Sequence, residues 1–392
     1  MHPLLHPPAC LLLVCGVAST DAHDAHGAYA AAGVDYDLLD PGKRLAQALA
    51  RGTERHLSRR GYAEVAASRG ESAYVVDAGD HYLATLTEGL GTKNLVADAV
   101  RPLTGRTHYD QVARDAVATI LNDLATVGAA PLAVSAYWAT GDSAWFADQE
   151  RVADLARGWA KACADAGAAW GGGETQVLAG IIQPGTIALA GAASGVVRPK
   201  ERLLTGDRLE AGDAILLAPA AGIHANGLTL ARSLAAQLPR GHATPVPGDP
   251  AGRGYGEALL DPAPLYGPLV EALHEAAIPL HYAVHVTGHG WRKLMRADRD
   301  LTYTVERLPP VPPVLDFLVE RLRLEDAEAY GTFNMGAGFV LYLPHSAIGQ
   351  AQQLARARGT DLLHAGTVEP GPRRVVLRPL GLTYDAASLR VR

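Results

Sequence analysis

A glycine-containing segment, Glu-Gly-Leu-Gly-Thr-Lys at residues 88–93, carries the residue types that bind a phosphate and a metal ion. Gly89 and Gly91 let the backbone approach a ligand closely and direct its N–H groups at an anion. Lys93 adds a positive charge suited to phosphate, and Glu88 offers a hard oxygen of the kind that binds Mg²⁺. The spacing of a Walker A loop is absent. Taken alone, the segment fits a tight turn with solvated charges better than a binding site.

A predicted helix over residues 111–127 carries a polar stripe that could bind a metal ion. Its apolar residues recur with the helical period, and Gly128 follows its end. Asp115 and Asn122 share one face, because seven residues make two turns, and Asp123 lies about 100° round the helix. Burying these side chains is expensive unless they bind a ligand or form hydrogen bonds. The alternative is an ordinary solvated face.

A third polar segment is Gly-Gly-Glu-Thr at residues 172–175, after a short predicted strand at 168–170. Ligand-binding residues are common on such loops. Glu174 could therefore bind a metal ion, although an exposed turn is the simpler interpretation.

The second half contains a loop, Gly-Ile-His-Ala-Asn-Gly at residues 222–227, between a predicted strand at 214–217 and a helix at 228–236. A glycine loop that opens a helix is a natural anion site. His224 could donate to a phosphate or a substrate carbonyl, and histidine titrates near neutral pH. The alternative is that Asn226 caps the helix and that His224 is structural.

Two further glycine-containing segments are candidates. Thr-Gly-His-Gly at residues 287–290 precedes a predicted helix at Trp291 and would make a second phosphate cradle. Thr-Phe-Asn-Met-Gly-Ala-Gly at 332–338 precedes a strand at 338–343. Both also fit plain turns.

The elements that must position these segments alternate between strand and helix. Asp40 and Pro41 predict an N-cap and first position of a helix that runs to about residue 56, with Leu45, Ala46, Leu49 and Ala50 inward. The other predicted strands are 82–87, 132–138 and 187–197, and the other predicted helices are 154–166, 265–276 and one that ends over 354–359. The charged stretch 198–212 contains a proline and two glycines and is the predicted domain boundary. The class is α/β or mixed α+β.

Composition excludes several classes of protein. The chain has 392 residues, enough for two domains, with 48% hydrophobic and 19% charged residues. A net charge of −6 gives no whole-chain basic footprint, so we expect no nucleic-acid partner. Cys10, Cys15 and Cys163 lack metal or disulfide spacing, which favours a reduced, cytoplasmic compartment.

The apolar run at residues 9–18 is too short to span a membrane. Because no other run is apolar enough, we expect no membrane partner. No Lys or Arg precedes the run, so an unstructured extension or misassigned start is favoured over an export signal.

The order of these motifs along the chain resembles the aminoimidazole ribonucleotide synthetase family, also called phosphoribosylformylglycinamidine cyclo-ligase. The resemblance covers about residues 29–375. Its motifs lie at residues 32–35, 88–93, 122–123, 128–132, 137–141, 172–175, 222–227, 285–288 and 332–336.

The resemblance implies a two-domain α/β (mixed α+β) fold. The N-terminal extension would cover residues 1–28 and lack fixed structure. An ATP-binding and dimerisation domain would span 29–198 and pair into a β-barrel of a homodimer. A C-terminal α/β domain would span 207–380.

The implied reaction is ATP-dependent ring closure of formylglycinamidine ribonucleotide, a small-molecule substrate of purine biosynthesis, with ATP and Mg²⁺ as cofactors. The implied Mg²⁺ ligands are Glu88, Asp115, Asp123 and Glu174. The implied catalytic residues are Lys93, His224 and Asn226. The implied nucleotide contacts are Gly89, Gly91, Thr92, Lys93, Asn122, Gly173, Thr175, Thr287 and Gly288.

Four departures from the family pattern bear on the substrate. Glu88 stands where the family has aspartate, residues 59–63 replace a Gly-Gly-Phe-Gly stretch, residues 176–179 replace Ala-Glu-Met-Pro, and His289 replaces a glycine. Two alternatives therefore stay open. The chain could be a divergent paralogue that phosphorylates a different amide or small molecule, or a non-catalytic nucleotide-binding protein.

Overall fold

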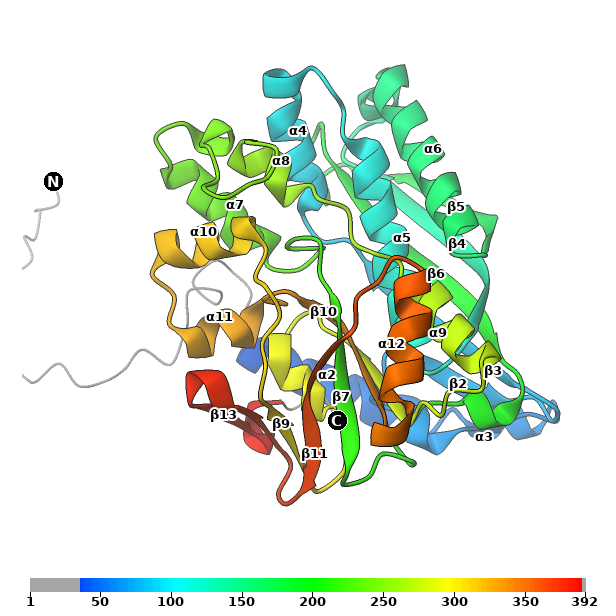
Figure 1. Cartoon of the computed structure of the whole chain (residues 1–392). Helices are drawn as coiled ribbons and strands as arrows, with labels where there is room; N and C mark the ends of the chain where they lie inside the picture. The colour runs from blue at the N-terminus through cyan, green and yellow to red at the C-terminus, as the bar shows by residue number, and fades with distance from the viewer. Residues whose placement is uncertain (1–35, 390–392) are drawn as a thin grey trace, which may run out of the picture.

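The computed structural model describes residues 36–389, which form two mixed β-sheets with helices packed against them (Figure 1). The predicted mixed α/β class is confirmed. The predictions for residues 1–28, the apolar run at 9–18 and the motif at 32–35 lie outside the described residues. In the described part of the chain, no helix is both long and apolar enough to cross a membrane.

The first half of the described chain forms a six-stranded sheet in the order β1-β2-β3-β6-β4-β5. Its neighbours are antiparallel except for the parallel pair β4 and β5. The strands are β1 (Ala63–Glu64), β2 (Tyr74–Asp77), β3 (Tyr82–Gly89), β4 (Ala130–Thr140), β5 (Ala169–Val177) and β6 (Ile187–Val197). The helices are α2 (Tyr36–Arg51), α3 (Arg55–Ser58), α4 (Lys93–Thr104), α5 (Tyr109–Ala125) and α6 (Gln149–Asp165), with 3₁₀ turns η1 (Ala66–Ser68), η2 (Ser143–Ala147) and η3 (Lys200–Arg202).

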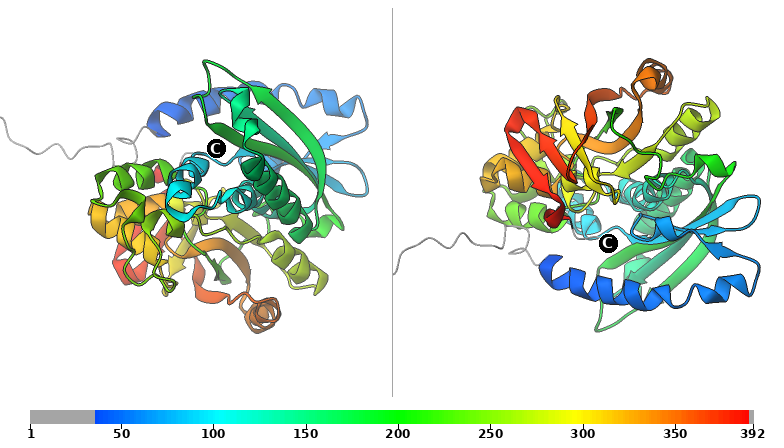
Figure 2. Two further views of the ribbon diagram at one scale, coloured as in Figure 1. Left: turned by 90° about the horizontal axis from the view of Figure 1, so that it is seen from above. Right: turned by 90° about the horizontal axis from the view of Figure 1, so that it is seen from below.

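Helices α5 and α6 cover one face of this sheet (Figure 2). Every second residue of β6 is buried, as expected for a strand with one covered face. Glycines on β6 let α5 approach closely, because a Cβ at Gly191 or Gly195 would come within 2.8 Å of Ile120 or Leu124. The opposite face is lined by small and polar side chains, and β5 is exposed along nearly its whole length.

The second half forms a seven-stranded sheet in the order β13-β12-β9-β11-β7-β10-β8. Only β9 and β12 are parallel. The strands are β7 (Asp213–Pro219), β8 (Tyr282–His285), β9 (Leu301–Val305), β10 (Ala337–Pro344), β11 (Leu363–Pro370), β12 (Arg374–Leu377) and β13 (Leu382–Asp385). The helices are α7 (Leu228–Gln237), α8 (Tyr255–Leu259), α9 (Gly267–Glu275), α10 (Pro313–Leu322), α11 (Asp326–Thr332) and α12 (Ile348–Ala357). The 3₁₀ turns are η4 (Gly241–Ala243), η5 (Gly290–Met295), η6 (His345–Ala347), η7 (Arg378–Leu380) and η8 (Ala386–Ser388).

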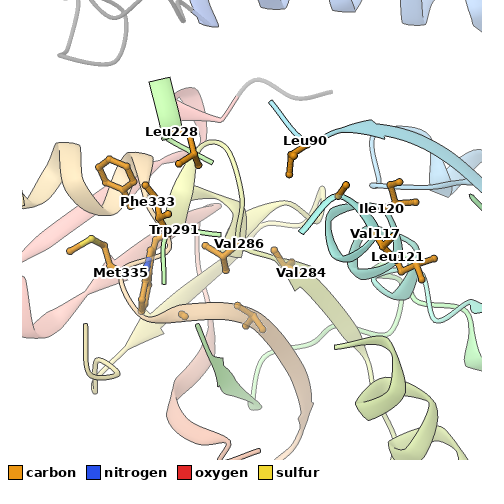
Figure 3. Close-up of a cluster of buried hydrophobic side chains, with 14 of the residues drawn as sticks. Leu90, Val117, Ile120, Leu121, Leu228, Val284, Val286, Trp291, Phe333 and Met335 are labelled. Atoms are coloured by element: carbon orange, nitrogen blue, oxygen red, sulfur yellow. The ribbon is translucent and has the colours of Figure 1, made fainter. Parts of the chain in front are cut away.

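One large apolar core joins the two halves. Leu90 and residues of α5 belong to the same buried cluster as residues of β8 and η5 (Figure 3). Val117 and Ile120 on α5 and Val284 and Val286 at β8 are each at most 2% exposed. Burial of this shared apolar surface stabilises the contact between the halves, and it fixes the loops of one half against those of the other.

The structure corrects two predictions about elements. Helix α2 begins at Tyr36, so Pro41 lies inside it rather than at its start, which removes a single backbone hydrogen bond. Its residues Leu45 and Leu49 are 62% and 70% exposed rather than inward. Residues 172–175 are not a loop, because β5 continues through them to Val177.

Candidate active site

Two carboxylates and a lysine meet where the halves touch. Glu88 comes from the end of β3, and Asp123 comes from the last turn of α5. His285, the last residue of β8, lies 2.7 Å from the Asp123 Oδ1 through its Nδ1. Lys293 on η5 donates to the Thr287 hydroxyl and interacts electrostatically with both carboxylates. Two predicted metal ligands and one predicted nucleotide contact are therefore brought together here.

Burial and charge set the ionisation of this cluster. Burial raises the pKa of Glu88, and the negative charge of Asp123 raises it further. Burial also opposes ionisation of Asp123, but the hydrogen bond from His285 and the nearby positive charges hold the pKa of Asp123 below its usual value. Burial lowers the pKa of Lys293 to about 8, against the attraction of Asp123. The ionisation of each of these groups thus depends on the charges and hydrogen bonds of its neighbours.

Sequence reasoning missed Lys293. It follows the predicted cradle at residues 287–290, and its place six residues after Thr287 is the one local signal in the sequence. A lysine in a predicted helix normally faces solvent, so this position indicated nothing special. The 3₁₀ geometry of η5 turns the side chain back towards Thr287, and it ends 8% exposed.

The glycine loop at residues 88–93 lies against the loop that contains His224. A Cβ built at Gly91 would stand 3.7 Å from the carbonyl oxygen of Ala225, and Gly91 has a φ of +77°. The loop leads into the N-terminus of the twelve-residue helix α4. The Thr92 hydroxyl is buried and has no partner among the described residues. An orphaned hydroxyl beside a helix N-terminus fits a phosphate oxygen, so these residues fit a nucleotide.

His224 is held as a neutral donor. It is 3% exposed, and burial lowers its pKa well below the usual value. Its Nε2 accepts from the backbone N–H of Ala221 at 3.3 Å, so the proton must sit on Nδ1. That Nδ1 is buried without a partner within residues 36–389. The geometry suits donation to a carbonyl or phosphate oxygen rather than acid–base exchange. Asn226 is half-buried in the same loop.

Three non-glycine residues in the loops of the second half that surround this site have a left-handed backbone conformation. His224, His289 and Met335 have φ values of 60°, 70° and 42°, which non-glycine residues rarely adopt. Asn334 fixes two of these loops, because it donates to the carbonyl of Gly222 and accepts from the N–H of Gly336. Such strain persists where surrounding contacts hold it and is typical of functional sites.

Three predicted ligand residues have a different role in this structure. Lys93 and Asp115 are both fully buried and form an ion pair with one another. Lys93 also donates to the carbonyl of Asp261, and Asp115 accepts from the N–H of Ala263 at 2.5 Å. Asn122 donates to the Pro264 carbonyl and accepts from the Tyr266 N–H.

These contacts hold a strap, residues 261–266, which has no regular secondary structure of its own. Its backbone groups are buried and need partners, and the polar stripe of α5 with Lys93 supplies them. The stripe is thus hydrogen-bonded rather than ligated. Lys93, Asp115 and Asn122 could reach a nucleotide or metal only by breaking these bonds, so the geometry does not support their predicted roles.

Glu174, Gly173 and Thr175 lie apart from Glu88 within one chain. They are on the exposed edge strand β5. Glu88 is paired with Gly191, Gly191 with Ala136, and Ala136 with Gly173. Three strand spacings separate the two ends of this series, roughly 14 Å. The four predicted Mg²⁺ ligands therefore do not converge in a single chain.

The carboxylates of Glu88 and Asp123 fit a divalent cation. His285 engages the Oδ1 atom of Asp123, and no hydrogen bond to its Oδ2 atom is found among the described residues. Two carboxylates leave most of an octahedral Mg²⁺ shell to waters and phosphate oxygens, which is the usual arrangement beside a nucleotide. Thr287 and Gly288 lie at the rim, both half-buried.

The fold and this site define a two-domain α/β protein with a polar site where its halves meet. Residues 70–197 match the family model for the AIR synthase related protein N-terminal domain, and residues 210–378 match that for the C-terminal domain. Because these matches span most of the chain, the protein belongs to the AIR synthase related family.

Relatives of similar length share about a third of the sequence. The chain is 36% identical to a phosphoribosylformylglycinamidine cyclo-ligase of Thermococcus kodakarensis, over 88% of this chain and 97% of that protein. It is 34% identical to one of Pyrococcus furiosus, over 89% and 97%.

Solved structures share the fold at lower identity. The hydrogenase maturation protein HypE in complex with ATP has a TM-score of 0.55 and 20% identity, over 79% of this chain and 87% of that one. The protein tt0281 of Thermus thermophilus has a TM-score of 0.53 and 23% identity, over 80% and 90%.

Proposed function

We propose that this protein is a phosphoribosylformylglycinamidine cyclo-ligase, an ATP-dependent ligase of purine biosynthesis. The observation that carries the proposal is the 36% identity to the Thermococcus kodakarensis cyclo-ligase across 97% of that protein's length. ATP as the cofactor also agrees with the similar HypE structure, which is a complex with ATP.

The reaction joins two steps. The γ-phosphoryl group of ATP passes to the formyl amide oxygen of formylglycinamidine ribonucleotide and releases ADP. An internal nitrogen of the substrate then attacks the activated carbon, the carbon–oxygen bond breaks, and the oxygen leaves with phosphate. The products are aminoimidazole ribonucleotide, ADP and phosphate.

The residues of this chain act mainly by positioning and by charge. The backbone of Gly89 and Gly91 and the Thr92 hydroxyl would hold nucleotide phosphates. The Nδ1–H of His224 would donate to the amide or phosphate oxygen, with Asn226 beside it. Glu88 and Asp123 would hold Mg²⁺, which neutralises phosphate charge when bound. Thr287 and Gly288 would contact a second anionic group.

We also propose that the protein is a homodimer. The support is the uncovered face of the six-stranded sheet and the exposed edge of β5, since open edges invite pairing with another chain. Gly173, Glu174 and Thr175 would then lie at the contact between two copies. A cytoplasmic location agrees with the use of ATP and a nucleotide precursor.

A direct assay tests the main proposal. Purified protein is mixed with formylglycinamidine ribonucleotide, ATP and Mg²⁺, and ADP and the imidazole product are measured. We expect both in equal amounts. Glu88→Ala should lower kcat at least a hundredfold with the fold intact. Folded protein that forms neither product nor ADP would refute the proposal.

One outcome would favour a different substrate. Glu88 and His289 depart from the family pattern beside the candidate site, and these changes support a divergent paralogue as the second candidate. If the protein binds ATP but forms no imidazole product, other amide-bearing ribonucleotides should be tried in the same assay.

A further inference from the structure

Lys293 is a buried positive charge at the candidate metal site. Its side chain is on η5 between Trp291 and Met295, both fully buried, and it is itself 8% exposed. Transfer of an ammonium group into such surroundings is unfavourable unless opposite charges or hydrogen bonds compensate it. The compensation comes from the Thr287 hydroxyl and from the charges of Asp123 and Glu88.

Two other positive charges act on Lys293, those of Arg296 and of Lys43, which is exposed on α2. Arg296 donates to the carbonyl of Gly70 and to the Ser72 hydroxyl, and its Nε lies 3.7 Å from the Glu71 carboxylate. Arg296 and Glu71 therefore balance one another. His285 gives its Nδ1–H to Asp123 as a hydrogen bond.

With Arg296 balanced by Glu71 and the exposed Lys43 screened by solvent, the cluster itself holds two carboxylates against one ammonium, hence one net negative charge. A pair of carboxylates without the ammonium would carry two, and nucleotide sites of that kind can attract a second divalent ion to restore neutrality. Here Lys293 supplies positive charge that a second divalent ion would otherwise supply.

We propose that Lys293 is a fixed internal cation of this site, which balances one of the two carboxylates so that Glu88 and Asp123 bind a single divalent ion weakly until the nucleotide arrives. The inference rests on the proposed function only in taking Glu88 and Asp123 as the metal ligands. Lys293 acts through these groups and through Thr287, so it is a positioning residue.

The test measures Mn²⁺ binding without nucleotide or substrate, through the loss of the free-ion signal in electron paramagnetic resonance. Lys293→Met should bind Mn²⁺ at least tenfold more tightly than the natural protein, because a repelling charge is gone. Lys293→Arg keeps that charge and should stay within about threefold. Lys161→Met removes an exposed lysine on α6 and should change nothing.

Glu88→Gln locates the ion, and it should weaken Mn²⁺ binding at least tenfold. If Lys293→Met does not fold, Lys293→Gln carries the same expectation. Unchanged Mn²⁺ affinity in the folded Met or Gln variant, tightening in the Arg variant to the same extent, or unchanged affinity in Glu88→Gln would each overturn the inference.

The titration contains no ribonucleotide. A failed cyclo-ligase assay with the expected order of Mn²⁺ affinities would therefore refute the proposed substrate and leave the role of Lys293 standing. The reverse result would refute Lys293 alone.

Discussion

At the scale of single residues, burial decides which polar groups are free to act. His224 and Thr92 each keep a buried polar atom without a partner among the described residues, beside the glycine loops. Lys93, Asp115 and Asn122 instead form hydrogen bonds to the strap. The polar residues predicted as ligands from the sequence therefore divide into two groups: those free to bind a ligand and those that hold the strap in place.

Buried histidines also make stability depend on pH. Burial lowers the pKa of His274 on α9 to about 4, and the nearby positive charges of Arg202 and Arg208 add to this. Unfolded histidine titrates near 6.5, so between these values the unfolded chain binds more protons than the folded one. The free energy of unfolding should thus fall as pH drops below about 6.5, with a loss of about 2 kcal/mol from this residue by pH 5.

The measurement is urea unfolding at pH 7 and pH 5. His274→Gln cannot titrate, so its stability should fall less over this range than that of the natural protein. His56→Gln, at an exposed position on α3, serves as the control and should behave like the natural protein. Equal pH sensitivity in His274→Gln would contradict the prediction.

At this scale the sequence could predict which residues have side chains suited to a ligand, but not which of them are already engaged in contacts within the protein. The carboxylates Glu88 and Asp123 were identified because Mg²⁺ chemistry requires their oxygens. The contacts of Lys93 with Asp261, of Asp115 with Ala263 and of Lys293 with Asp123 each join residues more than a hundred positions apart. No local pattern records such contacts.

At the scale of elements, periodicity predicted several of the long elements that line the core, such as α5 and β6. β6 has the predicted bounds, and α5 differs from its prediction by two residues at each end. Short strands such as β8 and the helices α10 and α11 were not predicted, because they contain too few residues to show a clear apolar periodicity. The inward face predicted for α2 was wrong, since amphipathic spacing shows that a face exists but not what covers it.

The strap at 261–266 depends on hydrogen bonds from side chains of α5 and from Lys93. Asn122→Ala leaves the Tyr266 N–H and the Pro264 carbonyl buried without partners, and each orphaned group costs about 1–3 kcal/mol. The free energy of unfolding, measured with urea, should fall by about 2–6 kcal/mol.

Asp110→Ala is the matched control, because it changes an exposed residue of the same helix and should cost under about 0.5 kcal/mol. Equal stabilities of the two variants would mean that water or relaxation of the strap satisfies the freed groups. The strap would then not depend on α5 in the way that we infer.

At the scale of the whole molecule, the two halves are unequally covered. The second sheet is buried among helices and joined to the first by a common core, whereas the first sheet leaves one face open. Exposed apolar side chains accompany that sheet and the loop beyond it: Leu132 at 48%, Trp170 at 37%, Val177 at 50% and Ile181 at 81%. In both views of Figure 2, α2 runs along the side of this sheet away from α5 and α6, but its described side chains are exposed and do not bury the face.

If this face joins two copies, a charge on β5 should separate them without unfolding either. Val177→Glu places a carboxylate on the exposed edge, where pairing with a partner would bury it unpaired. We expect light scattering to give the mass of two chains for the natural protein and of one chain for the variant, with unfolding of the separated chain unchanged.

Trp170 should report the same event, because its emission shifts to longer wavelength when water reaches the indole. Leu103→Glu on α4 changes a side chain that is 56% exposed away from β5 and should leave the dimer intact. A natural protein with the mass of one chain at every concentration, or a Val177→Glu dimer as tight as the natural one, would exclude this sheet face as the contact.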